Sequence, residues 1–420
     1  MIKTISILPG ITLRCFQDNR FKQSCLTVQF VRPMCQQEAS CNALIPAVLL
    51  RGCEDAPDLR DITLRLDDLY GASVGALVRR IGDYQTTGLH CSFVEDTYTL
   101  DGDKIMEPML RFLRQLLFAS VLENGAFRKD YVNNEKKNLI AAIASVRNDK
   151  RAYAMGQLLL KMCGKDSFGI PRLGEISQVK KLTPKKVYSH YQQVIRESPV
   201  EVFYVGSKEP EQVARLIEEM FAGIERNYVN LPAQSGFSGP AGGEYTEIMD
   251  VAQGKLAMGF VTPVTNRDED FAAMQVCNAL FGGGMTSKLF MQVREKNSLC
   301  YDIGSAYYGS KGILTVSAGI DCDKKDLVQA QILQQLDACC KGEITPQELT
   351  AAKQSLLSGL KSIHDGAGSI ESYYSTGALS GMAMAPAQYC QSVEQVTLEQ
   401  VAEAARSLKL HTVFFLKGEA

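Results

Sequence analysis

Apolar residues in the first half of the chain alternate between helical and strand-like spacing. Apolar positions recur at three- and four-residue intervals over 61–69, 105–119 and 134–146, which predicts amphipathic helices. Further helices are expected at 39–50 and 210–221, and a proline after Leu182-Thr183 opens another. Strands are expected at 12–15, 25–31, 73–81, 87–94 and 200–205, with Asp18-Asn19 as a hairpin turn between the first two.

The second half of the chain repeats this order of elements. Four short matches at similar offsets support the repeat: 69–73 with 280–284, 136–140 with 353–357, 182–187 with 396–401, and 202–205 with 413–416. The polar stretch 225–244 is rich in Gly, Pro and Ser, which is typical of a linker. The sequence therefore predicts a duplicated α+β lobe, with domains at 1–224 and 245–420 joined by a linker at 225–244.

Composition excludes several classes of protein. Hydrophobic residues make up 45% and charged residues 22% of the 420, as in an ordinary globular protein. A net charge of −2 argues against nucleic-acid binding, and no apolar run reaches the ~18 residues of a membrane span. The first residues lack a signal peptide, and the 13 cysteines contain no C-x-x-C pair. We expect a cytoplasmic protein with reduced thiols and no membrane or nucleic-acid partner.

One stretch carries candidate chemistry, from residue 281 to Tyr301. Three glycines, Gly282, Gly283 and Gly284, follow a predicted helix, and Thr286 and Ser287 are placed to cap a second, short helix. That helix leaves Arg294 near its C-terminus, and Tyr301 begins a strand-like run. The glycines have two explanations: a flexible lip that lets a peptide backbone approach, or a helix C-cap with a tight turn.

This stretch, GGGMTSKLFMQVREKNSLCY, resembles the arginine–tyrosine motif of the insulinase/pitrilysin/mitochondrial processing peptidase family, the inverted-motif zinc peptidases. The resemblance covers nearly the whole chain. It implies two homologous lobes, each a mainly antiparallel sheet backed by helices, joined by a linker. In active members the first lobe carries H-x-x-E-H on a helix, where two histidines bind zinc and the glutamate is the general base.

The resemblance places that zinc motif where this chain has no metal ligands. Aligned on the end of the helix, both histidine positions are alanine, Ala43 and Ala47, and the base position is Pro46. The third ligand falls within 135–143, at Ala142, and Glu135 alone is too little to hold zinc. The four histidines of the chain offer no replacement. We expect no metal and no cofactor in this chain, and no catalytic residue that acts on its own.

The resemblance then implies a complementing subunit. We expect Arg294 to clamp a peptide or protein substrate and Tyr301 to donate to the oxyanion, both at the zinc site of an active H-x-x-E-H partner of the same family. The alternative is a structural or peptide-binding subunit with no part in chemistry. More narrowly, the pattern is similar to the inactive member of a bacterial peptidase-like pair associated with the 5-aminopentanol modification of translation elongation factor P.

Overall fold

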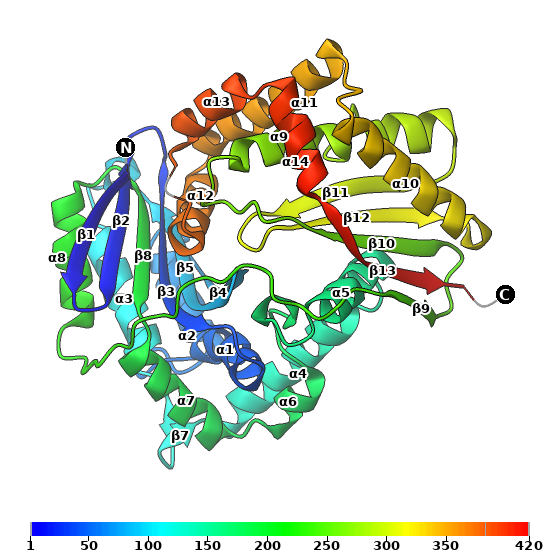
Figure 1. Ribbon diagram of the computed structural model, residues 1–420. Coiled ribbons are helices and arrows are strands. Elements are labelled where there is room, and N and C mark those ends of the chain that lie inside the picture. The colour runs from blue at the N-terminus through cyan, green and yellow to red at the C-terminus, as the bar shows by residue number, and fades with distance from the viewer. Residues whose placement is uncertain (1, 383, 419–420) are drawn as a thin grey trace. The chain divides into compact units, whose positions relative to one another are not determined.

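Strands from distant parts of the chain form two mixed sheets in the computed structural model, which describes residues 2–382 and 384–418 (Figure 1). Contacts divide the chain into two units, and each unit is built from three segments. Unit 1 comprises Met1–Ala144, Ile170–Ala233 and His364–Thr376. Unit 2 comprises Ser145–Gly169, Gln234–Ile363 and Gly377–Ala420.

Unit 1 contains a six-stranded sheet, a two-stranded ribbon and helices. The strands are β1 (Ile2–Leu8), β2 (Ile11–Gln17), β3 (Gln23–Pro33), β4 (Ser73–Ile81), β5 (Tyr84–Val94), β6 (Leu122–Glu123), β7 (Ala126–Phe127) and β8 (Val200–Gly206). The helices are α1 (Gln36–Leu49), α2 (Leu59–Asp68), α3 (Met106–Phe118), α4 (Lys129–Ser145), α6 (Ile176–Lys181), α7 (Pro184–Glu197), α8 (Pro210–Phe221) and most of α12 (Ala367–Ser380).

Unit 2 contains a five-stranded sheet with helices on both faces. The strands are β9 (Glu244–Ile248), β10 (Gly254–Val261), β11 (Asp302–Tyr308), β12 (Ile313–Ile320) and β13 (Lys409–Lys417). The helices are α5 (Lys150–Cys163), α9 (Phe271–Phe281), the π-helix η3 (Leu289–Lys296), α10 (Lys325–Cys340), α11 (Pro346–Ser362), α13 (Pro386–Gln395) and α14 (Leu398–Ser407).

The two sheets have the same topology, which confirms the predicted α+β duplication. The order β2-β8-β3-β5-β4 in unit 1 corresponds to β9-β13-β10-β12-β11 in unit 2, and only the first pair of each series is parallel. Three of the four sequence matches lie on corresponding elements. The match of 69–73 with 280–284 is wrong, because the first segment immediately precedes β4 whereas the second precedes η3, one element before β11.

The first two predicted strands exist, but the expected hairpin between them is wrong. β2 pairs with β1 on one side and with β8 on the other, and β8 separates it from β3. A turn at Asp18-Asn19 is compatible with either arrangement, since local turn residues do not determine which strand a segment pairs with.

A helix from the second half of the chain covers one face of the unit 1 sheet. Val28 and Phe30 of β3 point into the main core, so Thr27 and Gln29 point to the opposite face. There the buried carboxylate of Glu371, in α12, accepts hydrogen bonds from the Thr27 hydroxyl and the Gln29 amide, both at 3.1 Å. Arg79 of β4 pairs with the same carboxylate at 2.7 Å. These polar contacts hold α12 on the sheet.

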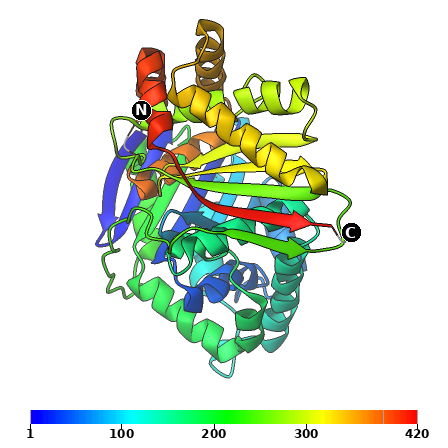
Figure 2. The same cartoon turned by 45° about the vertical axis from the view of Figure 1, so that its right-hand side comes forward.

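Unit 2 is covered in the corresponding way by a helix from the first half. Ala154 and Leu158 of α5 share a core with Ala257 of β10 and Phe414 of β13. The two elements pack closely at Gly259 of β10, where an added Cβ would lie 2.5 Å from the sulfur of Met162 in α5 and would displace that side chain. Figures 1 and 2 show α10 on the face of this sheet opposite to α5. Both faces of the central strands β10 and β12 are thus covered.

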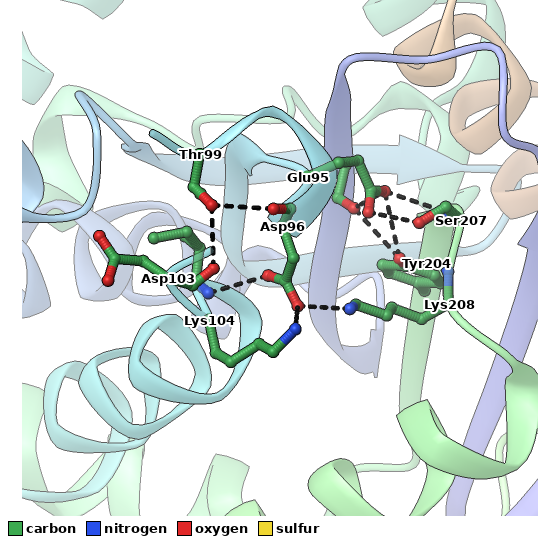
Figure 3. Close-up of polar contacts among 10 residues, drawn as sticks. Glu95, Asp96, Thr99, Asp103, Lys104, Tyr204, Ser207 and Lys208 are labelled. Carbon is green, nitrogen blue, oxygen red and sulfur yellow. Dashed lines mark hydrogen bonds and ion pairs between the residues drawn. The ribbon is translucent and has the colours of Figure 1, made fainter. Parts of the chain in front are cut away.

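A second buried carboxylate joins the ends of two strands in unit 1 (Figure 3). Glu95 follows β5 and is 2% exposed. It accepts hydrogen bonds from the Ser24 and Tyr204 hydroxyls, and from the backbone N–H (2.8 Å) and hydroxyl (2.6 Å) of Ser207. The next residue, Asp96, accepts a hydrogen bond from the Ile105 N–H at the start of α3. The loop from β5 to α3 is therefore anchored by hydrogen bonds.

Replacing Glu95 with alanine should lower the free energy of unfolding by about 3 kcal/mol, because it leaves several buried donors without their acceptor. Chemical denaturation followed by circular dichroism would measure the change. The exposed Glu54 provides a matched control, and Glu54→Ala should change stability by less than about 0.5 kcal/mol. Equal stabilities of the two variants would contradict the role assigned to Glu95.

Candidate functional site

The glycine turn after α9 is tightly packed at its first two positions. Gly282 caps α9, and its N–H donates to the Asn278 carbonyl at 3.0 Å. A Cβ on Gly282 would lie 2.7 Å from the Ser305 hydroxyl, and one on Gly283 would lie 2.7 Å from the Ala279 Cα. At Gly284 a Cβ would meet nothing within 4 Å. Packing therefore requires glycine at 282 and 283 and leaves 284 free to vary.

The short helix that follows is a π-helix, a form often found at functional sites. Its first turn is stabilised by Ser287, whose hydroxyl donates to the Gly284 carbonyl at 2.6 Å and accepts from the Phe290 N–H at 3.4 Å. Leu289 and Val293 are fully buried. Arg294 lies four positions after Phe290 on the same helix, and its guanidinium lies over the Phe290 ring, 4.6 Å from the ring centroid, where cation–π attraction holds it.

Arg294 and Tyr301 line one open pocket of about 460 Å³. Tyr301 lies just before β11, and its N–H donates to the Gly319 carbonyl of β12 at 2.8 Å. Its side chain is 54% exposed. The pocket also contains Cys300, Asp321 and Lys324. The structure therefore brings the predicted arginine and tyrosine together and adds charged residues that sequence reasoning missed.

The missed residues determine the state of the phenol. Tyr301 donates its hydroxyl proton to Asp321 Oδ1 at 2.8 Å, and the Lys324 ammonium lies 2.7 Å from Asp321 Oδ2. The hydrogen bond to Asp321 raises the pKa of Tyr301 above its ordinary value, and the charge of the carboxylate adds to this. Lys324, followed by the Tyr301 hydrogen bond, lowers the pKa of Asp321. Tyr301 is therefore a neutral phenol whose only proton is donated within the chain.

A pairing argument could have found Asp321 and Lys324. β11 and β12 form an antiparallel hairpin in which Asp302 lies opposite Gly319. Residue 301 therefore lies beside the segment that follows β12. The alternating pattern of the two strands indicates that they pair and so places Asp321 and Lys324 near Tyr301. This inference requires the register of the pair to within one residue.

Gly282, Gly283 and Gly284 line a different hollow of unit 2. Phe290 also lines this hollow, while Arg294, which lies over its ring, lines the first pocket. The two hollows are neighbours along η3.

The residues at the expected zinc position do not fit a metal. Ala43 is buried in α1, Ala47 is half-buried, and neither side chain carries a lone pair. Pro46 does not interrupt α1, in agreement with the helix predicted at 39–50, and the Leu50 N–H donates to the Pro46 carbonyl.

The carbonyl that Pro46 would leave without a donor is that of Asn42, four residues earlier. It accepts a hydrogen bond from the Thr87 hydroxyl at 2.7 Å instead. The helix therefore continues through the proline because a side chain of β5 replaces the missing backbone donor.

The nearby carboxylate is already neutralised. Glu135 is buried in α4 and pairs with Arg51, just past α1, while the Asn138 amide donates to its other oxygen at 3.1 Å. Ala142 lies on the exposed side of the same helix. Among the described residues, no group of three or more His, Cys, Asp or Glu side chains is arranged to hold a metal ion. A zinc ion therefore has no donor set in this part of unit 1.

Neutralising Asp321 should lower the pKa of Tyr301 toward its ordinary value of 10.0, because the anionic acceptor that retains the proton is lost. The titration can be followed by NMR of ¹³Cζ-labelled tyrosine, with Tyr301→Phe to assign the signal. Asp323→Asn removes a neighbouring charge on the same short turn, while the phenol donates to Asp321, and it is the control. An identical Tyr301 midpoint in wild type and Asp321→Asn would refute the assigned hydrogen bond.

The purified chain should contain far less than one zinc per molecule after dialysis against buffer with trace zinc, because methyl groups and a paired carboxylate cannot coordinate it. Inductively coupled plasma mass spectrometry would measure this, with an H-x-x-E-H member of the family as the positive control. One zinc per chain that survives a chelator would overturn the conclusion.

Within the described part of the chain, no helix combines the length and apolar character needed to cross a membrane.

Comparison with known proteins agrees with the geometry. Residues 181–356 match the family described as peptidase M16 inactive domain. A Bacillus subtilis (strain 168) protein described as "Probable inactive metalloprotease YmfF" is 30% identical over 409 residues, covering 97% of this chain and 96% of that protein.

Solved structures share the fold. A conserved protein from Enterococcus faecalis V583 has a TM-score of 0.92 at 26% identity, covering 100% of this chain and 99% of that one. A peptidase M16 inactive domain from Pseudomonas fluorescens has a TM-score of 0.82 at 15% identity, covering 100% and 98%. The predicted family is confirmed: this chain belongs to the M16 peptidases and is a homologue of their inactive members.

Proposed function

We propose that this chain is a non-catalytic, zinc-less subunit of an M16 peptidase complex, and that it supplies Arg294 and Tyr301 to the zinc site of an active partner. The observation that carries the proposal is that these two side chains open into one pocket of unit 2. The partner is an H-x-x-E-H subunit of the same family that holds the zinc, and the substrate is a peptide or protein.

Each residue has a chemical task. The Arg294 guanidinium has several donors in a fixed plane, which suits the backbone carbonyls of an extended peptide. Its stacking on Phe290 limits its motion without using all of those donors. The Tyr301 phenol can donate to an oxyanion that develops on the attacked carbonyl. The phenol has only one proton to donate. Its hydrogen bond to Asp321 must therefore break before Tyr301 can donate to the oxyanion of the substrate.

The altered unit 1 site supports the need for a partner. Ala43, Pro46 and Ala47 provide no metal ligand and no base, and Arg51 pairs with Glu135. A homologue that retains only the substrate-holding groups can contribute to peptide cleavage when another chain contributes the metal. The relative described as a probable inactive metalloprotease is consistent with this division of labour.

One observation favours the alternative of a structural or peptide-binding subunit. Both side chains already have contacts within unit 2, Arg294 with Phe290 and Tyr301 with Asp321. These contacts give the pair a local role that does not require chemistry. The two functions predict different results when the Tyr301 hydroxyl is removed: turnover falls if Tyr301 takes part in the chemistry and is unchanged if its role is structural.

The test uses this chain mixed with an H-x-x-E-H family subunit and a fluorogenic peptide. Tyr301→Phe should lower kcat of the mixture by about 10²-fold, the usual effect of removing one oxyanion donor, on the order of 3 kcal/mol. Arg294→Lys should raise KM, because an ammonium keeps the charge and loses the planar set of donors.

Tyr245→Phe is the matched control, because Tyr245 is another exposed tyrosine of unit 2 that lies outside the pocket. It should leave both constants unchanged. Normal turnover by Tyr301→Phe and Arg294→Lys mixtures would exclude the chemical role and leave the structural one.

A further inference from the structure

The second hollow of unit 2 is large enough for a side chain of a bound peptide. Its volume is about 580 Å³, and it lies between the N-terminal turn of α5, the glycine turn and the strands β11 and β12. It is distinct from the pocket that contains Arg294 and Tyr301.

Small residues create this hollow. On the α5 face, Thr315 of β12 pairs with Gly259 of β10, and Ser317 pairs with Ala257. Their β11 partners are Ala306 and Gly304. Side chains this short leave the space beside α5 unfilled. The hollow therefore results from the small residues of the strands beneath it and not from the conformation of a loop.

The charged residues at the rim are already paired. The Asp149 carboxylate caps α5 by accepting from the Ala152 N–H at 3.0 Å. The Arg151 guanidinium donates to the Ser317 hydroxyl at 3.0 Å and lies 3.7 Å from Asp302 Oδ1. A charged ligand group would therefore compete with contacts that the chain makes itself.

The remaining lining is apolar and adaptable. Met155 of α5 and Phe290 of η3 are half-buried, and Met285 on the glycine turn is 74% exposed. Methionine side chains adjust to apolar groups of different shape. An exposed methionine beside an apolar hollow gains from any ligand that removes it from water.

We propose that this hollow is a subsite for an uncharged, apolar side chain of the peptide, such as leucine or phenylalanine. Continuity with the neighbouring pocket supports this occupant: the Phe290 ring lines the hollow and carries Arg294 on its face. A peptide whose backbone is held by Arg294 and Tyr301 can then place a nearby side chain against Met155 and Met285. The position of the peptide beside Arg294 and Tyr301 rests on the proposed function. The preference of the hollow for an apolar side chain does not, because it follows from the residues that line it.

Gly284 offers a way to block the subsite without disturbing the fold. It lines the hollow, its φ lies outside the left-handed region, and an added Cβ meets nothing within 4 Å. Gly284→Val therefore places a side chain at the rim. Gly359→Ala is the matched control, because Gly359 also has open space around it and lies in α11, away from the hollow.

The first experiment uses the full chain alone, with ¹³C-methyl methionine. Capped tripeptides with a central leucine, phenylalanine, glycine or lysine are the probes. The leucine and phenylalanine peptides should shift the methyl signals of Met155 and Met285 and leave buried Met109 of unit 1 unchanged. They should bind about tenfold more tightly than the glycine and lysine peptides, as burial of one apolar side chain allows.

Gly284→Val should weaken binding of the leucine and phenylalanine peptides by about tenfold, and Gly359→Ala should not. Equal binding of all four peptides, the absence of shifts, or shifts that persist unchanged in Gly284→Val would overturn the subsite.

The second experiment adds the H-x-x-E-H subunit and measures cleavage of the same peptide series in longer form. Selective loss of leucine and phenylalanine substrates with Gly284→Val supports a subsite used during turnover. If the chain alone binds selectively and the mixture cleaves nothing, the proposed function fails and the apolar binding site stands. If the mixture cleaves all substrates equally in both variants, the subsite is overturned and the proposed function stands.

Discussion

Burial of both faces of the central strands of each sheet is the constraint on which this fold depends. β12 is buried along its whole length and β3 along nearly all of it, so neither strand tolerates water on one side. In each unit one face is covered by helices that are close in sequence, and the other by a helix from the opposite half of the chain, α5 or α12. The duplicated lobe is complete only after this reciprocal exchange. The hollow that we assign to an apolar side chain exists because α5 covers its sheet only in part.

Local patterns predicted the elements well and their partners poorly. The strand at 73–81 and the helix at 210–221 have the predicted bounds, because alternation and helical periodicity are properties of a single segment. The hairpin after β2 failed because β8, distant in the sequence, pairs between the two strands. α5 was not anticipated, since its burial depends on a sheet formed mostly from the second half.

The candidate site shows the same limit. Arg294 and Tyr301 were identified from one continuous string, whereas Asp321 and Lys324 depend on the register of β11 against β12. Pro46 lies inside a helix that the sequence predicted, and only the structure shows Thr87 donating to the Asn42 carbonyl. Asp321 lies beyond the motif, at the end of the neighbouring strand, so the acceptor of the Tyr301 proton could be found only from the pairing of the two strands.

The Arg51–Glu135 pair has a consequence for the folding of unit 1. Many metalloproteins gain folding free energy from their ion and are loosened by chelators. Here an internal guanidinium supplies the counter-charge for the carboxylate next to the altered motif, so this carboxylate needs no ion to balance it in the folded state. A chelator therefore removes no counter-charge from the contact between these two elements.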